Sequence, residues 1–143
     1  MPTSNARATW HGGLKQGEGE FEAGSSAFSG GYSFPTRFEG AEGTNPEELI
    51  AAAHAACLSM ALSGVLEREG HTPERISTTA RCTLEMVDGS PRIKRMRLSV
   101  EGVVPDIDQA TFLKAAETAK DGCPVSTALS GNVKFELEAT LKS

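Results

Sequence analysis

The sequence lacks clusters of basic residues and an apolar leader. Its 14 Lys and Arg residues are outnumbered by 19 Asp and Glu residues, which gives a formal net charge of −5. Proteins that bind nucleic acids usually carry a basic face, so this balance argues against a polyanion as partner. The opening stretch from Met1 to Arg7 is polar and contains none of the hydrophobic run that directs export. We therefore expect a cytoplasmic protein with no nucleic-acid or membrane partner.

Motifs for metals and nucleotides are also missing. The three histidines, at positions 11, 54 and 71, show no zinc-site spacing, and neither Cys-x-x-Cys nor His-Glu-x-x-His occurs. The glycines near the N-terminus do not form a phosphate-binding loop between a strand and a helix. The residues give no indication of a metal site or a nucleotide cofactor.

A long helix is predicted in the middle of the chain, from Pro46 to Glu69. Asn45 suits the N-cap, and Gly70 suits the left-handed C-terminal cap. Most of this stretch carries no charge, but it is rich in alanine and includes polar residues, so we interpret it as a buried helix rather than a membrane span. A helix that is apolar on all sides needs protein on all sides, and a second copy of a small chain is the simplest cover. The helix therefore predicts a homodimer.

Apolar alternation and turn residues predict the other elements. In chain order they are strands at 7–10 and 15–22, a docked loop at 24–35, an extended segment at 36–40, a hairpin of strands at 75–87 and 92–104, a helix at 109–120 capped by Asp108, a short helix opened by Cys123 and Pro124, and a strand at 133–141. The order β-β-α-β-β-α-α-β predicts an α+β fold with an antiparallel sheet packed on the long helix and two C-terminal helices. We expect one domain, residues 1–143.

The three cysteines have different surroundings. Cys82 lies on the apolar face of an alternating strand and is predicted to be a core residue. Cys57 lies among alanines in the long helix, where an inert buried cysteine is the commoner case. Cys123 opens a helix, where backbone amides and the helix dipole favour a thiolate. In a cytoplasmic protein a disulfide between such residues is more often transient and catalytic than structural.

Four segments, in this order and at this spacing, carry a resemblance to a known family. They are Thr36-Arg37-Phe38-Glu39-Gly40, Gly43-Thr44-Asn45-Pro46-Glu47-Glu48-Leu49, Ala52-Ala53-His54-Ala55-Ala56-Cys57 and Gly122-Cys123-Pro124-Val125-Ser126. Over nearly its whole length the chain resembles the osmotically inducible protein C and organic hydroperoxide resistance (OsmC/Ohr) family of thiol-dependent peroxidases. Arg37, directly ahead of the long helix, makes it similar to the osmotically inducible branch.

The resemblance implies a role for each motif residue. Cys57 would be the peroxidatic thiol, Cys123 the resolving thiol, and Arg37 with Glu47 the pair that activates Cys57. The implied protein is a cytoplasmic, intertwined homodimer with its active sites at the subunit interface and with no metal or organic cofactor. It would reduce organic hydroperoxides, and hydrogen peroxide as well, through a Cys57–Cys123 disulfide that a dithiol, such as a protein-bound lipoyl group, reduces again.

Physical chemistry explains why these residue types are needed. A thiol of pKa ~8.5 is only slightly ionised at neutral pH, and only the thiolate attacks a peroxide oxygen. An arginine within ~4 to 6 Å can lower a neighbouring pKa by roughly 1 to 3 units. Its planar guanidinium can hold the thiolate, a carboxylate and the peroxide oxygens together, which lysine cannot do as well. Candidates for an apolar pocket around Cys57 are Phe34, Phe38, Leu58 and Met60.

Helix geometry separates Glu47 from Cys57. Ten helical residues cover ~15 Å and leave the two side chains about 80° apart around the axis. A Glu47 that reaches a Cys57 should therefore come from the other subunit.

Two other functions remain open on the sequence. His54 lies three residues before Cys57 on the same helix face, which would also suit a Cys/His hydrolase or acyltransferase, although no orienting acid or oxyanion loop is evident. The second is a redox-sensing or structural dimer whose thiols oxidise without turnover.

Overall fold

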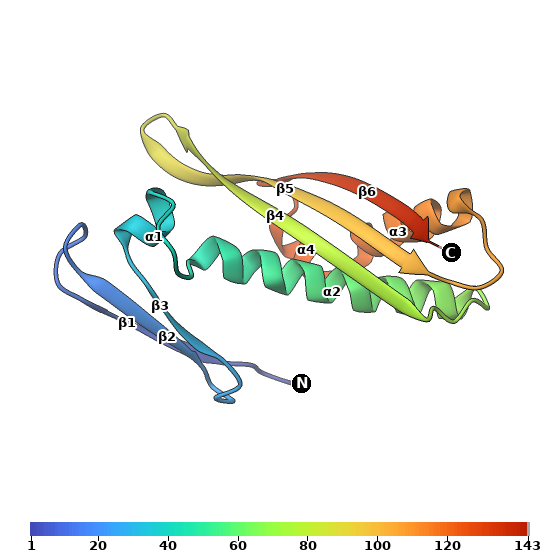
Figure 1. The fold of residues 1–143 in the computed structure, drawn as a ribbon, viewed down its shortest axis with the longest axis horizontal. Helices are drawn as coiled ribbons and strands as arrows, with labels where there is room; N and C mark the ends of the chain where they lie inside the picture. Colours follow the sequence, from blue (N-terminus) through green and yellow to red (C-terminus); the bar gives the residue numbers. More distant parts are fainter. Residues whose placement is uncertain (143) are drawn as a thin grey trace. The chain divides into compact units, whose positions relative to one another are not determined.

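The computed structural model describes residues 1–142 and divides the chain into two compact units, residues 1–49 and residues 50 onward. The long helix α2 (Pro46–Arg68) begins in the first unit and continues into the second. Strands and helices follow one another in groups along the chain, beginning and ending with strands, as Figure 1 shows, and the predicted α+β class is confirmed.

The first unit is a small antiparallel sheet followed by one turn of helix. Its strands, in the order β1-β2-β3, are β1 (Ala6–His11), β2 (Glu18–Ala23) and β3 (Ser29–Tyr32). The sequence analysis missed β3, which lies in the segment predicted as a docked loop.

The prediction of an extended segment at 36–40 is wrong, because helix α1 (Phe34–Phe38) occupies most of it. Ser33 is its N-cap, and its side chain accepts from the Thr36 amide while the Thr36 hydroxyl accepts from the Ser33 amide. This reciprocal cap satisfies two backbone donors. Pro35 adds a backbone already suited to a first helical turn.

The second unit contains the other three strands and two further helices. They are β4 (Arg75–Val87), β5 (Ser90–Val103), α3 (Gln109–Gly122), α4 (Pro124–Leu129) and β6 (Lys134–Lys142). The sheet order is β4-β5-β6, with β4 antiparallel and β6 parallel to β5. The predicted antiparallel sheet is therefore corrected to a mixed one. The cause is the long connection through α3 and α4. It returns the chain to the end of the sheet at which β5 begins, so that β6 runs in the same direction as β5.

The β4–β5 hairpin turns on two residues. Val87 pairs with Ser90, and between them Asp88 and Gly89 have φ values of 50° and 79°. Two consecutive positive φ angles are the requirement of a type I′ turn, whose twist matches that of the flanking strands, and Asp-Gly is a favoured sequence for it.

Both ends of α2 are capped as the sequence predicts. The Asn45 side-chain oxygen accepts from the Glu48 amide at 2.8 Å. At the other end Gly70 has a φ of 89°, and the His71 amide donates to the Leu66 carbonyl at 2.8 Å. This pattern is a Schellman motif, which satisfies carbonyl groups that the helix leaves unpaired.

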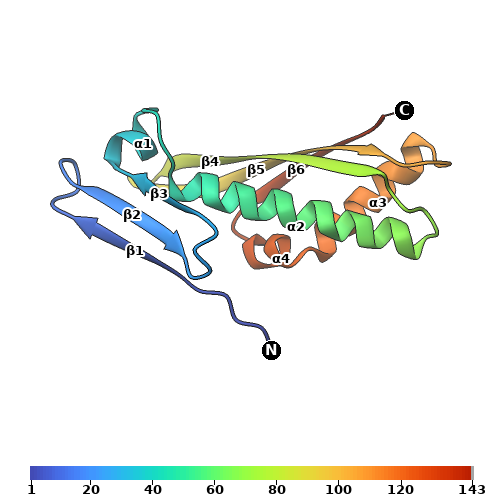
Figure 2. The ribbon, with the colours of Figure 1, turned by 60° about the horizontal axis from the view of Figure 1, so that its bottom comes forward.

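The core of the second unit lies between its sheet and its helices, which occupy the same side of the sheet (Figure 2). Its fully or almost fully buried apolar residues include Leu58, Leu62 and Leu66 of α2, Met96, Leu98 and Val100 of β5, and Phe112, Ala116 and Ala119 of α3. Cys82 is half-buried and packs against this core, in agreement with its prediction. Burying a large aliphatic side chain contributes roughly 1.5 to 3 kcal/mol, so this cluster fixes how α2 lies against the sheet.

The other side of α2 is exposed in the single chain. Ala52, Ala53 and Ala56 are exposed, and Met60 is 81% exposed. By length and composition alone, α2 is also the one helix among residues 1–142 that could cross a bilayer. A core helix of a soluble protein meets the same criterion, and the leucines of α2 lie in the core of this unit.

Candidate active site

The structure brings two of the predicted site residues into contact. Cys57, in the middle of α2, and Cys123, directly before α4, have their sulfur atoms 2.8 Å apart, although 66 positions separate them in the chain. An S–S bond is ~2.05 Å long, so a disulfide could form with less than about 1 Å of movement. The pair is therefore a tertiary contact between two helices.

Cys123 is held at the corner between two helices. It is the C-cap of α3, where its amide donates to the Ala119 carbonyl at 2.9 Å, and it is also the N-cap of α4. Pro124 follows and cannot continue α3, but it suits the first turn of α4. The Cys123 side chain is completely buried. This corner fixes the direction in which its sulfur points.

Cys57 is the accessible thiol of the pair. It is half-buried and lines a predominantly apolar cavity of about 500 Å³ between α2 and the end of α3, together with Met60, Val65 and Arg68. The prediction of Met60 as a pocket residue is therefore confirmed, whereas Leu58 is wrong as one because it is 0% exposed within the core. A small molecule in this cavity could reach the sulfur of Cys57 but not that of Cys123.

The two thiols have opposite pKa shifts in the single chain. Burial raises the pKa of the Cys57 thiol and its hydrogen bond with Cys123 raises it further, against a smaller lowering by the Val125 amide. Burial also acts on Cys123, but hydrogen bonds with Cys57, with the amide and hydroxyl of Ser126 and with the Val125 amide lower the pKa of the Cys123 thiol.

Arg37 and Glu47 form an ion pair within the first unit. The Arg37 Nε and Nη2 atoms lie 2.9 Å and 2.8 Å from the same Glu47 oxygen, Oε1. The Glu47 side chain is only 8% exposed and that of Arg37 is 36% exposed. The carboxylate of the pair is therefore almost enclosed, while the guanidinium stays partly open to solvent. Glu47 fixes one edge of the guanidinium and leaves its other nitrogen, Nη1, available to a further acceptor.

His54 contacts a residue that the sequence analysis quoted but to which it gave no role. Its Nε2 atom lies 2.7 Å from the Ser126 hydroxyl oxygen, and both side chains are buried. The equal spacing of His54 before Cys57 and of Ser126 after Cys123 was the signal that could have found this pair. A Cys/His nucleophile would need the ring nitrogen at the Cys57 sulfur, and here Nε2 is directed to Ser126.

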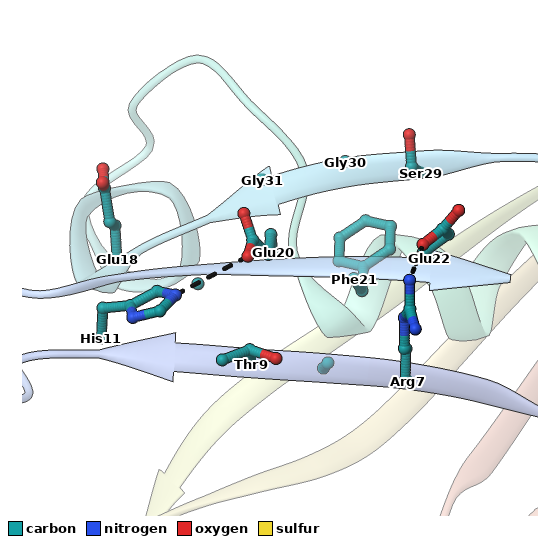
Figure 3. A pocket seen from close by; sticks show the side chains of 12 residues that line it. Arg7, Thr9, His11, Glu18, Glu20, Phe21, Glu22, Ser29, Gly30 and Gly31 are labelled. Atoms are coloured by element: carbon teal, nitrogen blue, oxygen red, sulfur yellow. Dashed lines mark hydrogen bonds and ion pairs between the residues drawn. The ribbon is translucent and has the colours of Figure 1, made fainter.

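Another hollow, larger than the cavity at Cys57, lies on the sheet of the first unit. It measures about 800 Å³ and is lined by residues of β1, β2 and β3, which include the charged side chains of Arg7, Glu18, Glu20 and Glu22 (Figure 3). Arg7 pairs with Glu22 at 2.7 Å and His11 lies 3.6 Å from Glu20. No thiol lines this hollow, and among residues 1–142 no three His, Cys, Asp or Glu side chains gather in a group that could hold a metal ion.

Fold and site together define an α+β protein whose long helix and short C-terminal helix hold two thiols in contact, one accessible and one enclosed. The family model described as OsmC-like protein matches residues 39–138. This chain therefore belongs to the OsmC-like family. The matched range contains Glu47, Cys57 and Cys123 and begins just after Arg37.

Individual relatives agree with this assignment. The chain is 46% identical over 133 residues to the peroxiredoxin OsmC of Escherichia coli strain K12, which covers 92% of this chain and 93% of the relative. It is 30% identical over 135 residues to the organic hydroperoxide resistance protein of Xanthomonas axonopodis pv. citri, with coverage of 92% and 91%. The crystal structure of the organic hydroperoxide resistance protein OhrB of Bacillus subtilis matches with a TM-score of 0.76 and 28% identity, over 94% of this chain and 97% of that one. The resemblance expected from the motifs is confirmed.

Proposed function

We propose that this protein is a thiol peroxidase that reduces organic hydroperoxides, and hydrogen peroxide as well, to the corresponding alcohol or water. The observation that carries the proposal is the 2.8 Å contact between an accessible and an enclosed sulfur atom. Membership of a family whose relatives are named peroxiredoxin and organic hydroperoxide resistance protein supports the same activity.

The reaction proceeds in two steps on the two sulfur atoms. In the first, the Cys57 thiolate attacks the outer peroxide oxygen, an S–O bond forms and the O–O bond breaks, and the alkoxide leaves as the alcohol after taking up a proton. In the second, the Cys123 sulfur attacks the Cys57 sulfenic acid, an S–S bond forms, and the hydroxyl leaves with the Cys123 proton as water. A dithiol, such as a protein-bound lipoyl group, then reduces the disulfide by exchange.

Arg37 and Glu47 activate Cys57 in this proposal. Burial and the hydrogen bond with Cys123 raise the pKa of the Cys57 thiol, so a cation near the sulfur would favour its ionisation. The buried Glu47 carboxylate orients the Arg37 guanidinium for this task.

A second chain supplies that cation. Glu47 and Cys57 lie ten residues apart on the same helix, so ~15 Å of helix separates them. The exposed apolar stripe of α2 at Ala52, Ala53, Ala56 and Met60 supports a partner helix at this position. In the resulting intertwined homodimer, Arg37 and Glu47 of each chain would complete the site of the other, and residues 1–143 would function as one domain. We place this dimer in the cytoplasm, with no organic cofactor.

Two alternatives are tested by the same chemistry. The hydrolase alternative is disfavoured because His54 Nε2 forms a hydrogen bond with the Ser126 hydroxyl and not with Cys57. A redox sensor would have the same thiol pair but would consume only a stoichiometric amount of peroxide. Steady-state consumption of cumene hydroperoxide with dihydrolipoamide as reductant separates repeated turnover from a single burst.

Mass spectrometry after one equivalent of cumene hydroperoxide tests the assigned roles. We expect an intramolecular Cys57–Cys123 disulfide in the parent chain and a trapped sulfenic acid on Cys57 in Cys123→Ser. The Cys57→Ser variant should show no first-step oxidation and is the matched control. Oxidation of Cys123 in that variant, at the parental rate, would overturn the assignment of the peroxidatic thiol.

A further inference from the structure

Two side-chain pairs connect α2 to α4. One is the sulfur pair of Cys57 and Cys123 at 2.8 Å, and the other is His54 Nε2 with the Ser126 oxygen at 2.7 Å. Each pair is three residues from the other on both helices, and three helical residues span only ~4.5 Å. His54 precedes Cys57 along α2, whereas its partner Ser126 follows Cys123, so the two segments run antiparallel and the two contacts lie side by side. A change in the His54–Ser126 distance must therefore shift the sulfur atoms relative to each other.

The His54 ring is enclosed by the protein on all sides. Its side chain is 0% exposed, and the ring meets Phe135 of β6 edge-on, with centroids 5.3 Å apart and an interplanar angle of 73°. Burial lowers the pKa of the imidazole below its ordinary value, which keeps the ring neutral. The ring can therefore donate from only one of its two nitrogens.

The tautomer of His54 follows from its second nitrogen. Among the described residues, Nδ1 is buried without a hydrogen-bond partner. An orphaned buried donor is rarer in folded proteins than an acceptor with an unused lone pair, so Nδ1 carries the lone pair and Nε2 carries the proton. Nε2–H then donates to the Ser126 oxygen, and the hydroxyl proton of Ser126 is free to point elsewhere.

Ser126 is the third residue of α4, and Cys123 is the N-cap of the same helix, with no side-chain hydrogen bond at that cap. The third helical position is the one whose groups come near a cap residue. Both the amide and the hydroxyl of Ser126 lower the pKa of the Cys123 thiol. A hydroxyl whose oxygen already accepts a hydrogen bond is also polarised, which strengthens the bond that it donates.

We propose that His54 and Ser126 are positioning residues for the second chemical step: they hold the start of α4 against α2 and aim the Ser126 hydroxyl at the Cys123 sulfur that attacks the Cys57 sulfenic acid. The step is balanced without them: the Cys123 thiolate forms the S–S bond, the S–O bond of the sulfenic acid breaks, and the departing hydroxide takes up a proton from the solvent, where Cys123 had released its own, and leaves as water. Their contribution is to keep Cys123 ionised and in line. This inference rests on the proposed function. It adds that His54 and Ser126 act only in the second step, since peroxide reduction at Cys57 should not depend on them.

Rapid-quench kinetics with cumene hydroperoxide separate the two steps. Dimedone traps the Cys57 sulfenic acid and mass spectrometry counts the disulfide over time. Because a hydrogen bond to a charged group contributes a factor of about ten or more, we expect Ser126→Ala to slow disulfide formation about tenfold while sulfenic acid forms at the parental rate. His54→Leu should behave alike, and His54→Gln, whose amide nitrogen can donate from near the position of Nε2, should restore most of the rate.

The matched control is Ser59→Ala. Ser59 lies on the same helix, and its hydroxyl makes a side-chain contact of the same 2.7 Å length with Thr78, away from the thiols. Both steps should stay at the parental rate in this variant. Parental disulfide formation in Ser126→Ala, or an equal slowing of both steps, would overturn the proposal.

A readout without peroxide keeps this test independent of the proposed function. In the Cys57→Ser background, the pKa of Cys123 can be measured from the pH dependence of thiolate absorbance. Ser126→Ala and His54→Leu should raise the pKa of Cys123, and His54→Gln should leave it near the value of the Cys57→Ser chain. If the parent chain formed no sulfenic acid at all, the peroxidase proposal would fail, and this pKa comparison alone would decide the role of the pair.

Discussion

Replacing Arg37 should destabilise the protein more than replacing its partner Glu47, because the Glu47 side chain is the more buried of the two. In Arg37→Met an apolar stem remains, but the Glu47 carboxylate, 8% exposed, loses both of its contacts at once. A buried ion left without its partner lowers the free energy of unfolding by roughly 3 to 5 kcal/mol. Because position 37 is partly exposed, water can reach the Glu47 carboxylate in the variant and offset part of this cost. We therefore expect a loss of about 2 kcal/mol. In Glu47→Gln the guanidinium, 36% exposed, can be hydrated, and the loss should be about 1 kcal/mol or less.

The assay is the urea midpoint of unfolding, measured at one protein concentration for all variants because a dimer would make stability depend on it. Arg7→Met is the matched control. The Arg7–Glu22 contact is equally short, 2.7 Å, but its side chains are 82% and 38% exposed, and such surface pairs contribute about 0 to 1 kcal/mol. Equal midpoints for Arg37→Met and Arg7→Met would refute the argument from burial.

Three further outcomes are expected. Mixing Glu47→Ala chains with Cys57→Ser chains should restore part of the peroxidase activity through heterodimers with one intact site, and no recovery would contradict a shared site. Because burial lowers the pKa of His54 below 6.5, the neutral ring contributes stability that is present above that pH and is lost as the pH falls through the lowered pKa. The urea midpoint of the parent should therefore fall more between about pH 7.5 and about pH 5 than that of His54→Gln, and parallel curves would contradict this sign. Gly102→Ala would place a methyl group 2.5 Å from the buried ring of Phe112, so overpacking should cost about 1 to 3 kcal/mol in thermal or urea unfolding, and an unchanged midpoint would mean that the ring has room to move.

The second unit could be predicted closely because its sequence agrees with its structure at each level. The predicted strand from Arg75 to Val87 has the bounds of β4, and the cap residues Gly70 and Asp108 perform the expected roles. Met86 alternates with Cys82, which would place it on the same apolar face, but it lies beyond the irregularity in the pairing after Thr83 and is 67% exposed. An irregularity in the pairing cannot be recognised from alternation in one strand.

The elements that were missed depend on partners rather than on local preference. β3 contains Gly30 and Gly31, poor strand formers, and its order comes from pairing with β2. The parallel direction of β6 is set by the connection before it, since alternation is the same in either direction. α1 is different, because Ser33 and Thr36 at capping-box spacing were visible in the sequence and outweigh the β-like appearance of the segment.

The thiol pair could be named only through the resemblance, because two cysteines whose numbers differ by 66 form no spacing motif. Its chemistry, by contrast, follows from the structure. The residue that meets peroxide, Cys57, is the one whose pKa a single chain raises, and the residue whose pKa it lowers, Cys123, is the one that peroxide cannot reach. The lowered pKa of Cys123 suits its attack in the second step, whereas the first step needs a thiolate at Cys57, whose pKa is raised. A cation close to the Cys57 sulfur would lower that pKa, which is the role we propose for Arg37 of a second chain.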